Sequence, residues 1–140
     1  MTVASSPRDD GAIRQTAPNI RAVIFDLDGT LLDTEALSCR AIIECFPSAD
    51  VGIGPIPPGV RAALEEGGLL LPWDLKRRIL GLRGSEWVPV VLSYARDVWG
   101  LEDVPENVGD EVVVDKFWKA WEARLSELCG EAEACPGARE

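Results

Sequence analysis

Apolar residues recur every three or four positions along most of this chain, which is the spacing of helices that bury one face. The pattern predicts a first helix over 34–46, with Asp33 or Thr34 available as its N-cap. It also predicts short helices over 60–66 and 73–80, the second followed by a glycine that favours a helix end. Most of the chain is therefore expected to be helical.

Two longer stripes predict amphipathic helices, one starting with Ser85 as its cap and the other running over about 108–129. The first stripe consists of Trp87, Val90, Val91, Tyr94, Ala95 and Val98. The second consists of Val114, Phe117, Trp118, Trp121, Leu125 and Leu128. The tryptophans of this half of the chain are interpreted as core and helix–helix packing in preference to a ligand cage, because large aromatic side chains dominate protein cores.

A different pattern precedes the first helix. Residues 21–25 form a short apolar run with β-branched members, which predicts a strand buried on both faces. Residues 2–19 are rich in Ser, Thr, Pro, Asp and Gly and are expected to form a flexible lead-in. Residues 47–60 hold so many prolines and glycines that they predict a hinge or loop.

Composition limits the chemistry and the partners. The 140 residues carry a net charge of −10, which argues against nucleic acid or an anionic membrane surface as a partner. There is no histidine, so Ser-His-Asp and Cys-His catalysis and His-containing zinc sites are excluded. The four cysteines, at spacings that suit neither a zinc knuckle nor a redox pair, are interpreted as reduced, mostly buried thiols of a cytoplasmic protein.

The chemically informative segment is a set of acids directly after the predicted strand. In extended chain, residues two apart point the same way, so Asp26 and Asp28 are expected to face one pocket while Leu27 turns to the core. Gly29 then permits a sharp turn. Asp33 is open to a plainer interpretation as a helix cap. A calcium-binding EF-hand is excluded, because the glycine falls at the wrong position of that loop.

These residues suit the hydrolysis of a phosphate ester. One carboxylate is expected to act as nucleophile or metal ligand and the other as proton donor. A hard divalent ion is needed to offset the charge of phosphate and carboxylate together, and Mg²⁺ fits best as this cofactor. The backbone over Leu27, Asp28, Gly29 and Thr30 is expected to bind phosphate oxygens.

The segment Asp26-Leu27-Asp28-Gly29-Thr30 resembles motif I of the haloacid dehalogenase-like hydrolase superfamily, and Leu31 to Glu35 extend the likeness. The resemblance implies that Asp26 is the nucleophile that forms an aspartyl-phosphate and that Asp28 is the general acid and base. It also implies that Asp26 and Asp28 hold the Mg²⁺, the latter through its backbone carbonyl. Because the second aspartate is kept in phosphatases and phosphomutases, the resemblance favours a Mg²⁺-dependent phosphatase acting on a small phosphorylated metabolite. It also implies an α/β fold.

In that family a helical cap domain follows motif I. The resemblance therefore implies a Rossmann-like core strand and catalytic loop over 20–33, a helical cap over 34–130, and a return towards the core over 131–140. The stretch from Ile79 to Glu86 is similar to a cap loop that helps to select the substrate. Within these elements, Glu35 and Arg83 are the candidates for specificity contacts.

The later motifs of that family find no counterpart in the sequence, so we expect the chain to be an N-terminal portion with little activity on its own. A single strand also requires neighbours, which another segment or a separate chain would supply. Two alternatives stay open. One is a sugar-phosphate mutase similar to β-phosphoglucomutase, and the other is a non-catalytic module that binds a partner.

Overall fold

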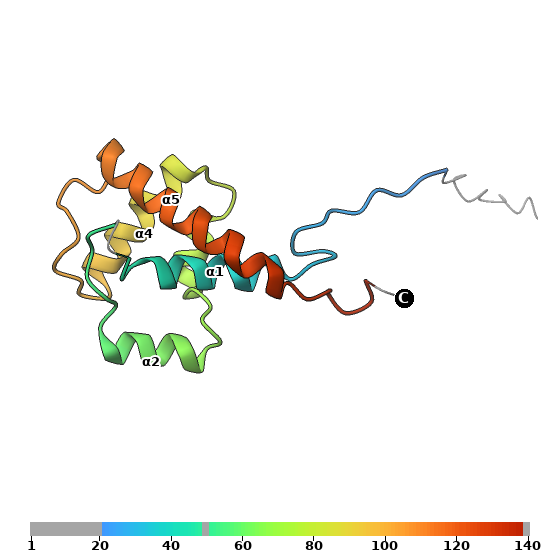
Figure 1. Cartoon of the computed structure of the whole chain (residues 1–140), viewed down its shortest axis with the longest axis horizontal. Coiled ribbons are helices and arrows are strands. Elements are labelled where there is room, and N and C mark those ends of the chain that lie inside the picture. Colours follow the sequence, from blue (N-terminus) through green and yellow to red (C-terminus); the bar gives the residue numbers. More distant parts are fainter. Residues whose placement is uncertain (1–20, 49–50, 139–140) are drawn as a thin grey trace, which may run out of the picture.

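The computed structural model describes residues 21–48 and 51–138 and is built from helices (Figure 1). They are α1 (Thr34–Cys45), α2 (Pro58–Glu66), α3 (Trp73–Ile79), α4 (Gly84–Asp97), α5 (Glu111–Leu128) and the short 3-10 helix η1 (Cys129–Glu131). The expected helical content is confirmed, and the short helices lie where periodicity placed them.

Aspartate side chains cap the starts of α1 and α5. The Asp33 carboxylate accepts a hydrogen bond from the backbone of Ala36 at 3.4 Å, so the plainer interpretation of Asp33 as the N-cap of α1 is confirmed. Asp110 caps α5 in the same way through Val112 N at 2.9 Å, which starts this helix at residue 111 rather than near 108. The expected start of α4 at Ser85 is wrong, because the helix already begins at Gly84.

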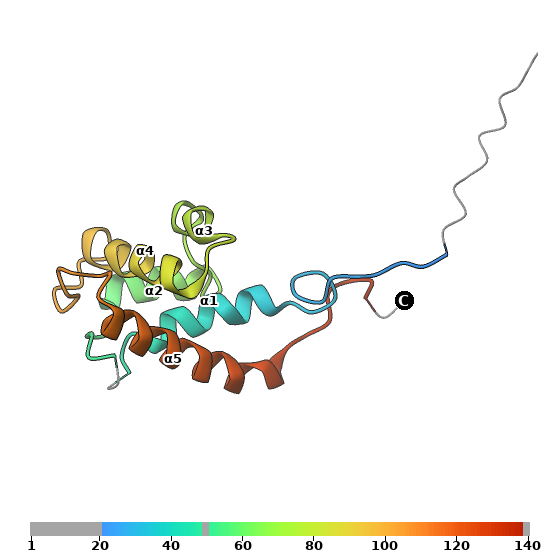
Figure 2. The ribbon, with the colours of Figure 1, turned by 90° about the horizontal axis from the view of Figure 1, so that it is seen from above.

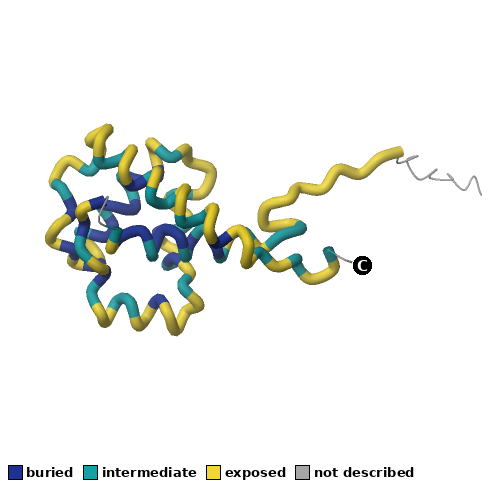
Figure 3. Tube along the Cα trace, viewed as in Figure 1, coloured by how far each residue is buried: buried dark blue, intermediate teal, exposed yellow. Residues whose placement is uncertain are grey.

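The core lies where α1, α4 and α5 meet. From above, α1 lies between α5 and the pair formed by α3 and α4 (Figure 2). At the centre, Phe117 is fully buried and its ring lies 5.1 Å from that of Phe46 and 6.2 Å from that of Trp87, both with edge-to-face geometry. The buried positions gather in this helical part, whereas the segment before α1 is exposed (Figure 3). Aromatic packing of helix faces therefore holds the fold together.

The expected α/β fold is wrong for this structure. Residues 21–27 form no strand, and the described part of the chain has no sheet, only isolated bridges from Leu32 to Asp28 and to Ala134. The run that was expected to be buried on both faces is exposed to solvent, because 95% of the surface of Ile24 and 65% of that of Phe25 are accessible. A strand exists only through pairing of its N–H and C=O groups, and residues 21–26 make no backbone hydrogen bond to any other described segment.

The remaining expectations have mixed outcomes. The flexible lead-in over 2–19 lies outside the described residues. The Pro- and Gly-rich stretch ends earlier than expected, because α2 already begins at Pro58.

Of the four thiols, all unpaired, Cys39 and Cys45 are buried as expected, but Cys129 is exposed and Cys135 is only half-buried. Within residues 21–48 and 51–138, no helix has the length and apolarity needed to cross a membrane.

An ion-pair network ties α1 to α5. Glu44 on α1, whose side chain is 17% exposed, accepts hydrogen bonds from Arg40 Nε at 2.9 Å and from Arg124 Nε at 2.7 Å. Burial alone would raise the pKa of Glu44, but the hydrogen bonds from the two guanidinium groups outweigh it and leave this pKa below its ordinary value. The charged form of Glu44 thus stabilises the folded state.

We expect the free energy of unfolding to fall on acidification, because the unfolded chain protonates Glu44 at a higher pH than the folded chain does. The stabilisation is complete above the ordinary glutamate pKa of about 4.3 and is lost as the pH drops through the lower folded value. Glu44→Gln should lower stability at pH 7 by about 1–3 kcal/mol and flatten this acid dependence. Urea unfolding at several pH values checks this, with exposed Glu122→Gln as the control that should change neither quantity.

Candidate functional site

The acid loop, residues 26–33, is a tight turn ahead of α1. Gly29 has a φ of +70°, the left-handed conformation that glycine adopts without strain. Its N–H donates to Leu32 O at 2.8 Å, and the N–H of Leu32 donates to Leu27 O at 2.9 Å. The expected sharp turn at Gly29 is confirmed. The loop also contacts the C-terminal segment, because Asp33 N donates to Glu133 O at 2.9 Å.

Of the three aspartates of the loop, the two proposed for chemistry, Asp26 and Asp28, are exposed to water, and each is oriented by a neighbour. Asp26 Oδ1 accepts from the N–H of Leu27 at 3.0 Å. Asp28 Oδ1 accepts from the Thr34 hydroxyl at 3.2 Å, which ties it to the first turn of α1. Both carboxylates are therefore open to a ligand, and Asp28 has the more defined position.

The phosphate-binding backbone expected over residues 27–30 is partly engaged. The N–H of Leu27 binds Asp26, and that of Gly29 binds Leu32, while Thr30 is exposed at the turn. The Leu27 side chain does not turn to a core as expected, because it is 53% exposed. The reason is that inward pointing in a strand requires a packed sheet, and residues 21–27 have none.

Asp28 lines a cavity of about 580 Å³, here called the acid cavity. Gly29 and Thr34 line it beside Asp28, and Glu35, Ser38 and Trp121 form part of its wall. The expectation that Asp26 and Asp28 face one pocket is not met in this cavity, because Asp26 is not among its lining residues. The reason is that residues 21–27 form no strand, whose alternation would hold the two side chains on one side. The structure brings Asp28 and Glu35 to this cavity instead. Of the described residues that line it, none is cationic. An anion in this cavity would need its charge offset from elsewhere.

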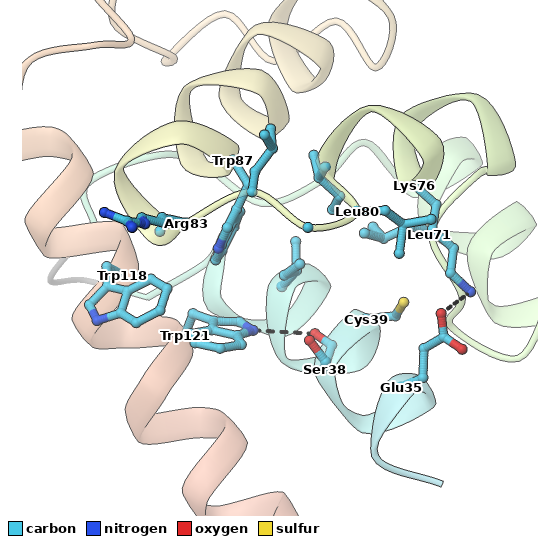
Figure 4. A pocket seen from close by; sticks show the side chains of 15 residues that line it. Glu35, Ser38, Cys39, Leu71, Lys76, Leu80, Arg83, Trp87, Trp118 and Trp121 are labelled. Atoms are coloured by element: carbon cyan, nitrogen blue, oxygen red, sulfur yellow. Dashed lines mark hydrogen bonds and ion pairs between the residues drawn. The ribbon is translucent and has the colours of Figure 1, made fainter. Parts of the chain in front are cut away.

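A second cavity, of about 350 Å³, lies between α1, α5 and the α3–α4 turn and is here called the tryptophan cavity (Figure 4). Trp87, Trp118 and Trp121 line it from one side, and Lys76 and Arg83 line it as well. It shares Glu35, Ser38 and Trp121 with the acid cavity. The two cavities therefore adjoin, and the predicted specificity residues Glu35 and Arg83 both line the second.

Glu35 has a partner that the sequence did not indicate. Its Oε1 lies 2.5 Å from Nζ of Lys76 on α3, and this hydrogen bond raises the pKa of Lys76 above its ordinary value. Lys76 therefore stays charged at the edge of the tryptophan cavity. Arg83, at the N-terminus of α4, is exposed and donates its backbone N–H to Glu86 Oε2 at 2.9 Å. Arg83 is thus a second cationic residue of the lining, with its guanidinium directed away from Glu35 and Lys76 (Figure 4).

The donor chemistry of the acid loop fits Mg²⁺, which prefers carboxylate oxygens, binds through one or two of them and keeps several waters. Asp26 and Asp28 are two such donors in an exposed loop. Among the residues that the structure describes, no group of three or more His, Cys, Asp or Glu side chains comes together as a metal site. The loop by itself therefore supplies only part of a coordination shell.

Gly84 keeps the tryptophan cavity in shape. A Cβ atom at this position would lie 2.2 Å from Cε3 of Trp118, so the indole rests directly on the glycine backbone. We expect Gly84→Ala to displace Trp118 and to lower the free energy of unfolding by about 1–3 kcal/mol through overpacking. Near-UV circular dichroism and urea unfolding measure both effects. Gly59→Ala is the matched control, because it also lies in a first helical turn but faces open space, and it should be neutral or stabilising.

Comparisons with protein-family models, with curated proteins and with solved structures find no match for this chain. The assignment of roles thus depends on the geometry itself. Sequence reasoning missed Lys76 and Ser38, whose positions in helical segments give no sign that they face Glu35 or the cavities. Its interpretation of Trp118 and Trp121 as core and helix–helix packing is confirmed, because both pack against the buried cluster. It did not indicate that both are half-buried and border cavities.

Proposed function

We propose that this chain takes part in Mg²⁺-dependent hydrolysis of a small phosphate monoester, with the acid loop as the reacting element. The resemblance of residues 26–30 to motif I of the haloacid dehalogenase-like hydrolases supports the proposal. The observation that carries it is the exposed pair of aspartates, one of which lines a cavity large enough for a small metabolite. Cytoplasmic substrates suit a chain whose four thiols are unpaired.

In the proposed reaction, a carboxylate oxygen of Asp26 attacks phosphorus and the ester P–O bond breaks. Asp28 gives its proton to the departing alkoxide. Asp28 then takes a proton from water, and the resulting hydroxide attacks the phosphorus of the aspartyl-phosphate. The P–O bond to Asp26 breaks, which releases inorganic phosphate and restores both side chains.

The remaining parts of the reaction are charge compensation and positioning. Mg²⁺ would be held by the Asp26 carboxylate and by the backbone carbonyl of Asp28, and it would supply electrostatic compensation for phosphate and carboxylate together. The Thr34 hydroxyl holds Asp28 at 3.2 Å and so orients its proton. Because no cationic side chain lines the described acid cavity, we expect slow turnover unless another segment or chain contributes one.

The test is phosphate release by the full chain at a concentration comparable with that of the substrate. Glucose 1-phosphate is supplied with Mg²⁺ or with EDTA, and products are separated by chromatography. The proposal predicts inorganic phosphate only when Mg²⁺ is present. Formation of glucose 6-phosphate in its place would favour the mutase alternative. Absence of both products, here and with 1-naphthyl phosphate as substrate, would favour the non-catalytic binding module and would overturn the proposal.

A further inference from the structure

The tryptophan cavity has a lining that the proposed chemistry does not use. Trp87, Trp118 and Trp121 form a mutually packed group, with ring centroids 5.4 Å apart for Trp87 and Trp121 and 4.7 Å apart for Trp118 and Trp121. Trp87 is buried, but the other two are only half-buried. Packing in the core therefore does not account for the whole surface of Trp118 and Trp121, and part of each indole borders the cavity.

The size of the cavity suits a ring. An apolar protein cavity of about 150 Å³ is enough to bind benzene, and the tryptophan cavity measures about 350 Å³. Its upper edge is formed by the α3–α4 turn, where Leu80 and Leu82 are 57% and 38% exposed, so the space is reachable from solvent. Indole faces and edges favour planar aromatic partners. An aromatic ring, unlike a sugar ring, has no hydroxyl groups that would lose their solvation when it stacks on an indole.

The charges around the cavity indicate the other part of the ligand. Its lining contains two cationic residues, Lys76 and Arg83, and one acidic residue, Glu35. The chain as a whole has a net charge of −10. A cationic edge in an acidic protein favours an anionic ligand. Glu35, Ser38 and Trp121 line both the tryptophan cavity and the acid cavity, where Asp28 lies.

We propose that the tryptophan cavity binds the planar aromatic group of a phosphate monoester whose phosphate is directed towards the acid loop. The phosphate half of this inference rests on the proposed function, whereas the ring half does not. The substrate class is thus an aryl or heteroaromatic phosphate in preference to a sugar phosphate. Trp118 and Trp121 provide the stacking surface, and Ser38 lines both cavities.

The experiment measures binding to the full chain by calorimetry and by saturation-transfer NMR. The probes are 1-naphthyl phosphate, ribose 5-phosphate and unphosphorylated 1-naphthol, each with Mg²⁺. We expect 1-naphthyl phosphate to bind about tenfold or more tightly than ribose 5-phosphate, and saturation transfer to the naphthyl protons of 1-naphthol as well. Equal affinity for the two phosphates, or no transfer to 1-naphthol, would overturn the inference.

Variants locate the ring. Trp121→Leu and Trp118→Leu should each weaken binding of 1-naphthyl phosphate about tenfold. Trp73→Leu is the matched control, because Trp73 is 68% exposed and does not line the cavity, and it should leave the affinity unchanged. Ser38→Leu adds bulk to the wall that the two cavities share without removing an aromatic ring. It should also weaken binding and serves if a tryptophan variant fails to fold. Equal losses in the Trp73 and Trp121 variants would contradict the assignment.

The outcomes separate this inference from the proposed function. If 1-naphthol binds with the expected dependence on Trp121 but no phosphate is released, the ring site stands and the hydrolase proposal fails. If phosphate is released with Mg²⁺ and sugar and aryl phosphates are used equally, the hydrolase proposal stands and the ring site fails.

Discussion

Asp26→Asn is expected to lower Mg²⁺-dependent release of phosphate about 1,000-fold or more, because an amide cannot attack phosphorus and no second carboxylate takes its place. The variant should keep its fold, since the Asp26 side chain is exposed and its one hydrogen bond, at 3.0 Å, is to the next residue. The measurement is inorganic phosphate released under single-turnover conditions, with far-UV circular dichroism as the check on folding.

Asp33→Asn is the matched control for this prediction. It makes the same substitution in the same loop, and asparagine caps helices as well as aspartate does, so α1 should be preserved. We expect Asp33→Asn to retain phosphate release within a few-fold of the unchanged chain. If Asp33→Asn lost as much activity as Asp26→Asn, loop structure and not nucleophilic attack would explain the loss, and the role of Asp26 would be wrong.

The second large effect is on stability. Phe117→Ala should lower the free energy of unfolding by about 3–5 kcal/mol, because it removes a fully buried ring from between Phe46 and Trp87 and leaves a cavity. That loss is a large share of the about 5–15 kcal/mol that stabilises a typical domain. Urea unfolding followed by tryptophan fluorescence gives the value.

Val112→Ala tests whether the effect of Phe117→Ala is specific to the core. Val112 lies on the same helix, α5, but is 63% exposed, so its truncation should change stability by no more than about 0.5 kcal/mol. A cost below about 1 kcal/mol for Phe117→Ala would contradict the aromatic cluster as the centre of the fold.

The helices were predictable from sequence because the information is local. The stripe that contains Phe117 and Leu128 repeats at helical spacing, and both residues are fully buried on α5 as the pattern indicates. Helix starts were less accurate. The sequence favoured Ser85 as a cap, but the close packing of Trp118 on Gly84 fits α4 beginning one residue earlier. That contact joins distant segments and leaves no local signal.

The strand prediction failed because an apolar run specifies burial only if something covers it. Residues 21–25 have the composition of a buried strand, yet Ile24 is 95% exposed and no described segment pairs with this stretch. The acid loop was predictable in part, because the turn at Gly29 depends on a single glycine. Pairings across the fold, such as that of Lys76 with Glu35, depend on tertiary structure and were not predictable from the sequence.

The central claim is that Asp26 becomes covalently phosphorylated, and trapping this species tests it most directly. The full chain is incubated with Mg²⁺ and a phosphate monoester, quenched in acid and measured by intact mass, and fragmentation of the proteolytic peptide over 22–40 locates the group. We predict one phosphoryl group, on Asp26, that is lost in Asp26→Asn and kept in Asp33→Asn. An unmodified chain, or a phosphoryl group on another residue, would contradict the account.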